Sequence, residues 1–392
     1  MTSSTGTADH RAIAAGMVMG FATGANVANV GAIATPLSTQ YGVSLAIVGL
    51  FTTALFVTHA AAMIPGGQAI DRFGARRLGL MALTIIVVGN AAAVITSDTA
   101  LLLAARVFIG VGTGVGFIAA STYIRAAGGT AFAQGLFGGI ANAGGAAALA
   151  VVPQLQRWFE WRSPFVFTLV LAVVALAVLV LAPLRRSREL RGRPVHLRDM
   201  FQLIGDRRLH GFAAMQASGF GLSIIVGNWV STLLEHHGYS TTLATGLGAV
   251  VLGLSVISRP LGGWIDRAYP SSTRTCVAVS LAACSAACLG LAASGPIWLA
   301  VCSALVLGIA SGIPFAPAFT GGANARPDAP GAAVGLINMA GAVTILVLTP
   351  LIGMTFSLPG DGRMGFLVIA ALWAAALLVV PVFNKPATPA NA

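Results

Sequence analysis

Three ionisable side chains interrupt the long apolar stretches of this sequence, and all three are basic. They are Arg106, Arg259 and His59, whereas none of the 11 Asp and Glu residues lies in the middle of such a stretch. A guanidinium group is planar and suits a carboxylate, nitrate or similar oxyanion through paired hydrogen bonds. We therefore predict that Arg259 and Arg106 contact an anionic substrate. The alternative is structural, with both arginines bonded to backbone carbonyls or extended to a polar interface.

His59 and two asparagines are further candidates for a substrate site. A histidine can contact substrate or carry a proton, because it titrates near neutral pH; its alternative role is a neutral hydrogen bond between helices. Asn142 and Asn338 lie in similar glycine-rich segments and could bond an anion from opposite halves of the chain, or simply join helices. The glycine run at 110–114, which follows Arg106, predicts a close-packing helix face.

A short charged segment after the second apolar stretch suggests a gate. Its spaced residues are Gly67, Asp71, Arg72, Gly74, Arg76 and Arg77, and a weaker copy is Asp266-Arg267. A carboxylate at a helix end can interact with the N-terminus of a neighbouring helix, or with a basic residue, and hold that side closed. We predict this gating role; the alternative is that the charges only anchor a helix end in the cytoplasm.

Membrane-spanning helices must position these residues. Charged residues make up 8% of the chain and hydrophobic residues 57%, against about 25% charged in an ordinary soluble domain. A spanning helix needs about 20 apolar residues. The sequence predicts an all-α membrane protein of twelve transmembrane helices, in apolar runs at 12–34, 45–67, 78–96, 100–121, 131–153, 164–183, 211–233, 242–264, 275–294, 296–319, 332–355 and 364–383.

The two halves of the chain resemble each other. Segment 65–72 matches segment 260–267, and segment 139–145 matches segment 335–341 at nearly the same offset. Such repeats place a substrate site near the middle of the membrane, between the halves. We predict two pseudo-symmetric six-helix bundles, 1–184 and 211–392, joined by a basic cytoplasmic linker at 185–210.

Basic residues set the predicted orientation. All but five of the 22 Lys and Arg residues fall on segments that are cytoplasmic if the N-terminus is inside. The positive-inside rule then predicts a multi-pass protein of the cytoplasmic membrane with both termini in the cytoplasm. The net charge of +11 does not indicate nucleic-acid binding, because the arginines lie in short gaps between apolar runs.

Other kinds of chemistry find little support in the sequence. The four cysteines, Cys276, Cys284, Cys288 and Cys302, lie in apolar runs without metal-ligand spacing, and we expect them to fill space in the core. Glu235-His236-His237 is the one cluster that suggests a metal, and it is weak. No nucleophile with an activating base is evident. We therefore expect no enzyme activity, no cofactor and no metal.

The charged segment at 67–77 resembles the signature loop of the major facilitator superfamily. Its weaker copy at Asp266-Arg267 lies where that family has one, and Arg106 with the following glycines resembles the family's second motif. The resemblance covers the whole chain. It implies a secondary transporter that moves a small solute by alternating access, with protons as a possible coupling ion.

Within that family, the paired asparagine segments on the fifth and eleventh helices are similar to those of nitrate/nitrite porters. The Arg259-Pro260-x-Gly262-Gly263 stretch is similar too. Those porters carry a second arginine before the Ile64-Pro65 position, where this chain has Met63. The leading hypothesis is a transporter of small organic or inorganic anions. The alternatives are a proton-coupled multidrug or metabolite exporter and a non-transporting membrane sensor on the same fold.

Overall fold

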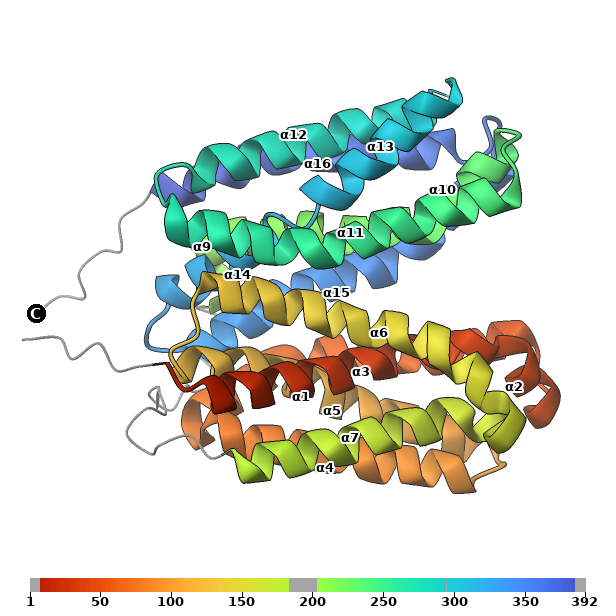
Figure 1. Ribbon diagram of the computed structural model, residues 1–392, viewed down its shortest axis with the longest axis vertical. Coiled ribbons are helices and arrows are strands. Elements are labelled where there is room, and N and C mark those ends of the chain that lie inside the picture. The colour runs from red at the N-terminus through yellow and green to blue at the C-terminus, as the bar shows by residue number, and fades with distance from the viewer. Residues whose placement is uncertain (1–7, 183–202, 294, 385–392) are drawn as a thin grey trace, which may run out of the picture. The chain divides into compact units, whose positions relative to one another are not determined.

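The computed structural model describes residues 8–182, 203–293 and 295–384 (Figure 1). Every element in these ranges is a helix, which confirms the all-α class. The chain divides into two compact units. Unit 1 comprises Met1–Leu197 and Pro327–Gly335, and unit 2 comprises Arg198–Arg326 and Leu336–Ala392. Most of the predicted linker at 185–210 lies outside the described residues.

The helices of unit 1 occur in the first part of the chain. They are α1 (His10–Ala28), η1 (Gly31–Ile33), α2 (Ala34–Tyr41), α3 (Leu45–Phe73), α4 (Ala75–Ile95), α5 (Thr99–Ala126), α6 (Ala131–Phe159), η2 (Glu160–Arg162) and α7 (Ser163–Leu181). The helices of unit 2 are α9 (Arg207–Gln216), η4 (Ala217–Leu222), α10 (Ser223–His236), α11 (Thr241–Ala268), α12 (Thr273–Ala292), α13 (Ile297–Ala310), α14 (Phe315–Ala325), η5 (Thr355–Ser357), α16 (Arg363–Ala376) and η6 (Leu377–Asn384). Helix α15 (Pro330–Met354) begins in unit 1 and continues in unit 2.

Ten stretches of the described chain are long and apolar enough to cross a membrane. One of them, Ala131–Leu181, contains both α6 and α7, and α1 is not among the ten. Large apolar side chains such as Ile95, Leu181 and Ile257 are exposed, as expected of surfaces that face lipid. The chain is therefore a multi-pass membrane protein, while the number of twelve spans stays a prediction.

Local signals explain how the unit 1 helices begin, end and pack. The side chain of Asp98 accepts a hydrogen bond from Leu101 N at the start of α5, and such N-caps satisfy free backbone donors. Gly74, at a φ of +91°, separates α3 from α4, a conformation that favours glycine. The glycine run of α5 packs closely as predicted, because a Cβ at Gly110 or Gly114 would collide with the α3 backbone.

Unit 2 differs from the predicted continuous helices at two places. The run at 211–233 contains a π-helical turn, η4, between α9 and α10. The run at 296–319 is divided into α13 and α14 by a turn at residues 311–314. Both interruptions contain glycine, and the second also contains Pro314, which cannot donate a helical hydrogen bond. The expectation of core cysteines holds for Cys284 and Cys288 but is wrong for Cys302, which is exposed.

Candidate functional site

In unit 2, the guanidinium group of Arg259 lies against two aromatic rings. Its Cζ atom is 4.8 Å from the centre of the Phe315 ring and 5.3 Å from the centre of the Phe220 ring. The Arg259 side chain is 1% exposed. Aromatic faces attract a cation, yet a neutral ring leaves the net charge of the guanidinium in place. This arrangement therefore suits a residue that meets an anionic ligand.

Two irregular backbone segments bring these rings to Arg259. Phe220 belongs to the π-helical turn η4, and Phe315 begins α14 directly after the turn at 311–314. Gly312 in that turn allows close approach, because a Cβ there would lie 3.0 Å from Arg259 Cγ. π-Helical turns are frequent at functional sites, and interrupted helices commonly form the binding sites of transporters.

Two buried amides, Gln216 and Asn338, lie close to Phe220. Gln216 Nε2 donates a hydrogen bond to Asn338 Oδ1 at 3.1 Å, and both side chains are buried. A Cβ at Gly341, one turn after Asn338, would lie 2.8 Å from Phe220 Cδ1 and 3.6 Å from Gln216 Cγ. Through Phe220, the amides are thus linked to the arginine. We call Gln216, Phe220, Arg259, Phe315 and Asn338 the unit 2 cluster; it combines one cation with amide donors and acceptors.

In unit 1, Arg106 is fully buried and its guanidinium is bonded to three oxygen atoms. Nε donates to Phe51 O at 3.1 Å, Nη1 to Asn29 Oδ1 at 3.2 Å and Nη2 to Asn26 O at 3.2 Å. Two of these acceptors are backbone carbonyls. The hydrogen bonds of Arg106 therefore favour the structural alternative, in which it fastens α1 and α3 to α5.

The polar contacts of Arg106 continue through unit 1. Asn90 Nδ2 donates to Asn26 Oδ1 at 2.9 Å, and Thr168 Oγ1 donates to Asn90 Oδ1 at 2.8 Å. Asn29 Nδ2 lies 3.3 Å from Thr168 Oγ1. We call Asn26, Asn29, Asn90, Arg106 and Thr168 the Arg106 network. The network joins α4, α5 and α7 to α1 and to Asn29, the residue directly after α1. All five side chains are fully buried.

The other two unit 1 candidates lie on different helices. His59 Nδ1 is 2.9 Å from Thr113 Oγ1, which itself donates to Gly110 O at 3.0 Å. A hydroxyl has a single proton to donate, so this chain of contacts favours a proton on Nδ1 and leaves Nε2 as an acceptor. Asn142 is half-buried on α6. It follows Ala141, whose backbone meets Gly24 of α1.

Asp71 accepts hydrogen bonds from the start of another helix. Its Oδ1 accepts from Gly331 N at 2.8 Å and its Oδ2 from Ala332 N at 2.9 Å, in the first turn of α15. The side chain is 1% exposed. Gly67 makes this approach possible, because a Cβ there would lie 2.7 Å from Ala332 Cα. A carboxylate at a helix N-terminus is stabilised by the free N–H groups and the helix dipole.

The basic residues of the same segment serve other contacts. Arg76 Nη2 donates to Val180 O at 3.1 Å, which ties α4 to α7. Arg72 lies over the Phe73 ring at 4.9 Å, and Arg77 is exposed. The Asp71 carboxylate accepts its hydrogen bonds from the backbone of α15.

The weaker copy of the segment has different chemistry. Asp266 accepts hydrogen bonds from Thr273 Oγ1 and Thr320 Oγ1, both at 3.1 Å. Arg267 is exposed. Asp266 thus joins α11 to α12 and α14 through side-chain hydroxyls.

Sequence reasoning missed several members of these sites. Gln216, Phe220 and Phe315 lie in apolar runs, where an amide or a ring looks like ordinary packing. The π-helical turn that positions Phe220 has no distinct sequence signal beyond Gly219 and Gly221.

The Glu235-His236-His237 cluster lies near Asp361 and Arg363. His236 Nδ1 lies 3.8 Å from Asp361 Oδ1, with both side chains exposed. Burial, with a contribution from Arg363, lowers the pKa of His237. Within the described residues, no three His, Cys, Asp or Glu side chains gather in a way that could hold a metal ion.

Known proteins resemble the chain in sequence profile and in fold. Residues 16–349 match the profile of the Major Facilitator Superfamily. The E. coli fucose:proton symporter FucP superimposes with a TM-score of 0.75 at 15% identity, covering 96% of this chain and 99% of that one. The human organic anion transporter MFSD10 gives 0.72 at 15%, covering 95% and 99%. The proton:xylose symporter XylE gives 0.72 at 14%, covering 94% of each. No curated protein matches the sequence significantly.

Proposed function

We propose that this chain, which belongs to the major facilitator superfamily of membrane transporters, carries a small organic or inorganic anion by alternating access. The observation that carries the proposal is Arg259, which is 1% exposed and lies against the rings of Phe220 and Phe315. A buried cation is costly unless it meets compensating groups. A planar anion would add paired, charge-assisted hydrogen bonds to the guanidinium. The likeness to MFSD10 supports the fold, and the anion assignment rests on the unit 2 cluster.

The anion proposal extends to the amides of the cluster and to the size of the substrate. Gln216 and Asn338 would hydrogen-bond the oxygens that Arg259 leaves unbonded. Met63 occupies the position of the second arginine of nitrate/nitrite porters, so a single guanidinium would hold the anion. One bidentate contact favours a monovalent ion, such as a small carboxylate, over a multiply charged one. Asn142 stays a proposed contact from α6.

The gate of this transporter would be the contact between Asp71 and α15. Asp71 accepts hydrogen bonds from Gly331 and Ala332 in the first turn of α15, and this turn belongs to unit 1. From Leu336 onward, the same helix belongs to unit 2. Because one helix carries both parts, releasing its first turn would free it to move with the rest of unit 2. Arg72, Arg76, Arg77 and Gly74 would shape the helix ends, and Asp266-Arg267 would support the equivalent region of unit 2.

We further propose that the bundles 1–184 and 211–392 move about the linker 185–210, with both termini in the cytoplasm. This orientation follows from the arginine distribution. A cysteine introduced at Tyr239 or Leu358 would then react with an impermeant thiol reagent added outside, and one introduced at Ser187 would not. The reverse pattern would overturn the orientation.

Proteoliposome uptake tests the proposed function. Labelled acetate, lactate, nitrate, a neutral sugar and a cationic dye are offered with and without an imposed pH gradient. Saturable uptake of an anion, with competition among small anions, is expected. Transport of the dye alone would favour the multidrug-exporter hypothesis. Transport of the sugar alone would contradict the anion-site hypothesis.

The role of His59 in coupling is tested in the same assay. No carboxylate is predicted at mid-membrane, so proton dependence would pass through His59 or through the substrate itself. His59→Gln should then lose any pH dependence of uptake between about pH 5 and 8, where histidine normally titrates. Thr113→Val is the matched variant, because it removes the partner of Nδ1 and keeps the imidazole.

A further inference from the structure

Trp373 of α16 is fully buried, and its indole N–H donates a hydrogen bond to the interrupted helix of unit 2. Its Nε1 atom lies 3.1 Å from Ser218 O, a backbone carbonyl of the π-helical turn η4. Tryptophan is seldom fully buried, and a buried indole usually finds a hydrogen-bond partner. Here the partner belongs to the turn that contains Phe220, one of the two rings against Arg259. The indole bond therefore joins α16 to the backbone of the proposed anion site.

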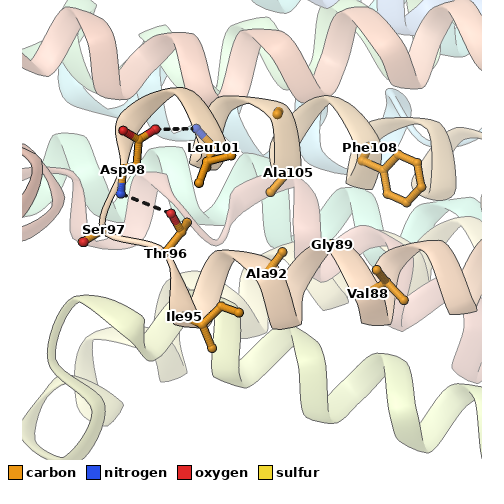
Figure 2. A pocket seen from close by; sticks show the side chains of 11 residues that line it. Val88, Gly89, Ala92, Ile95, Thr96, Ser97, Asp98, Leu101, Ala105 and Phe108 are labelled. Carbon is orange, nitrogen blue, oxygen red and sulfur yellow. Dashed lines mark hydrogen bonds between the residues drawn. The ribbon is translucent and has the colours of Figure 1, made fainter.

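The carbonyls of a π-helical turn inside a membrane need donors from side chains. At the connection between α4 and α5, the free backbone groups are satisfied locally, because Asp98 accepts from Leu101 N and Thr96 Oγ1 accepts from Asp98 N (Figure 2). Residues 217–222 lie instead in the middle of Arg207–His236, a stretch long and apolar enough to cross a membrane. The hydrocarbon region offers no water to carbonyls that leave regular helical bonding.

Three side chains supply such donors. Ser218 Oγ donates to Ala214 O at 2.8 Å, and Ser223 Oγ lies 2.9 Å from Gly219 O and equally far from the next carbonyl oxygen. Trp373 is the third donor. The two serines belong to the interrupted helix itself, where bonds of this kind commonly bend the backbone. The indole, in contrast, supplies a bond that ties the turn to a neighbouring helix.

Close contacts with two further segments enclose the turn. A Cβ at Gly219 would lie 3.0 Å from Ser311 O, at the break between α13 and α14. A Cβ at Gly221 would lie 2.9 Å from Thr344 Cβ on α15. These contacts limit sideways movement of the turn. The bond from Trp373 adds a directional constraint, because a hydrogen bond weakens steeply when its angle is lost.

The register of the turn decides how Phe220 is oriented. A π-helical bond spans one residue more than an α-helical bond. Conversion of the turn to regular helix would therefore rotate one side of the helix against the other by about 100°, the angle of one residue. Gln216 directly precedes the turn, whereas Phe220 lies within it. Conversion would turn the Phe220 ring relative to the Gln216 amide, so the contacts with Arg259 and Asn338 could not both persist.

We propose that Trp373 is a positioning residue of the anion site: its indole N–H holds the π-helical turn in the register that keeps Phe220 against Arg259 and Gln216 beside Asn338. The effect on binding rests on the proposed function, whereas the effect on the turn rests on the contacts above. Trp373 does not itself contact the anion in this role. Without the N–H, a smaller fraction of the protein has the binding-competent register, and the apparent affinity falls with that fraction.

Two replacements of Trp373 remove the N–H. Trp373→Phe keeps an aromatic ring, and β-(3-benzothienyl)alanine in place of Trp373 keeps the full bicyclic size, with sulfur where the N–H was. The second replacement carries the test if the first does not fold. Equilibrium binding of labelled acetate, lactate and nitrate to purified protein should weaken about two- to tenfold in both, the range that one hydrogen bond supports.

Fluorine NMR follows the ring of Phe220 without any ligand. The protein is prepared with 4-fluorophenylalanine in place of Phe220. Arg259→Met should shift its fluorine resonance, which establishes that the resonance reports the contact between ring and guanidinium. Both Trp373 replacements should shift or split the same resonance, because the turn then populates a second register.

Trp229→Phe is the matched control. Trp229 Nε1 also donates to a backbone carbonyl of unit 2, Thr349 O at 3.0 Å, but this carbonyl lies on α15 and outside the turn. Trp229→Phe should leave anion affinity and the fluorine resonance at their wild-type values, whatever its effect on thermal unfolding.

The outcomes separate a positioning role from a purely structural one. Wild-type affinity in a folded Trp373 variant, even one with a lower thermal midpoint, would overturn the proposal. An unmoved fluorine resonance, or equal changes in Trp229→Phe, would overturn it as well. If the wild type bound none of the three anions, the proposed function would fail, and the fluorine resonance would still decide whether Trp373 holds the turn.

Discussion

Among the described residues, each unit of this transporter contains one fully buried arginine, and the two arginines have different surroundings. In unit 1, Arg106 donates hydrogen bonds to Phe51 O, Asn26 O and Asn29 Oδ1. In unit 2, Arg259 lies against the rings of Phe220 and Phe315. Oxygen acceptors fix the direction of the N–H groups that they bond, whereas aromatic faces attract the charge and fix direction weakly. The arrangement around Arg106 suits an arginine that holds helices together, and the arrangement around Arg259 suits an arginine that binds a ligand.

The backbone around the two arginines also differs, because it is regular around Arg106 and interrupted near Arg259. Arg106 lies in the continuous helix α5, whose neighbours α1, α4 and α7 are joined by the Arg106 network. Arg259 lies near a π-helical turn and a break at 311–314. Interrupted helices contain backbone groups outside regular hydrogen bonding, which are tolerated in a membrane mainly around cavities and sites. We therefore propose that unit 1 uses its arginine for stability and that unit 2 uses its arginine to bind substrate.

The largest expected effect is on folding, from Arg106→Met. Methionine has a similar length and no donors, so Asn29 Oδ1 and two carbonyls lose a charged partner in a buried place. Unsatisfied buried polar groups cost about 1–3 kcal/mol each, so we expect the thermal midpoint in detergent to fall markedly or the yield of folded protein to collapse. Arg259→Met is the matched comparison and should lower the thermal midpoint less than Arg106→Met does. Equal destabilisation of the two variants would remove the distinction.

The second expected effect is on affinity, from Arg259→Met and Arg259→Lys. Truncating one partner of a buried charge pair typically costs about 2–5 kcal/mol, which is at least tenfold in affinity. Lysine keeps the charge but loses the planar fork, so the order should be wild type, then lysine, then methionine. Equilibrium binding of the transported anion to purified protein measures this. Wild-type affinity in a stable Arg259→Met variant would end the anion-site hypothesis.

The third effect is on rate, from Asp71→Asn. The asparagine loses the charge that meets the N-terminus of α15, an interaction of about 0.3–2 kcal/mol. A change in a conformational equilibrium alters the populations of states more than the chemistry of the binding site. Transport should therefore slow while anion affinity stays within a few-fold. Asp266→Asn is the comparison in unit 2. Its amide keeps one oxygen acceptor, and the other threonine hydroxyl can turn to accept from the new N–H, which a backbone N–H facing Asp71 cannot do, so the effect should be smaller. Wild-type transport by Asp71→Asn would remove the gate.

Much of the fold can be predicted from the sequence because the membrane imposes strong rules. Apolar runs identify the helices, and the repeated Pro-Gly and Asp-Arg segments identify a duplicated chain. The helix boundaries are less accessible. Helix α2 and the π-helical turn depend on packing among neighbours, and neither has a hydrophobic pattern of its own.

The sites divide in a similar way. Arg106 and Arg259 both stand out, because an ionisable residue in an apolar run is rare. Their difference does not stand out, since it depends on which atoms surround each guanidinium. Asn29 and Asn90 look like minor polar residues in the sequence, and only their positions around Arg106 and Thr168 reveal a network. The sequence could predict that Asp71 contacts the N-terminus of some helix, but only the structure shows that this helix is α15.

The smallest expected effect compares two phenylalanines, one beside each arginine. Phe220 contacts Arg259 through its ring, whereas Phe51 contacts Arg106 through its backbone carbonyl. Phe220→Leu should therefore weaken anion binding by about two- to fivefold, because a cation–π contact contributes about 0.5–1 kcal/mol. Phe51→Leu keeps the carbonyl, and should lower stability through lost packing while leaving affinity unchanged. Binding and thermal unfolding, measured on both variants, separate the two roles. If Phe51→Leu weakened anion binding as much as Phe220→Leu, the side chains around both arginines would belong to the substrate site, and the contrast between the units would fail.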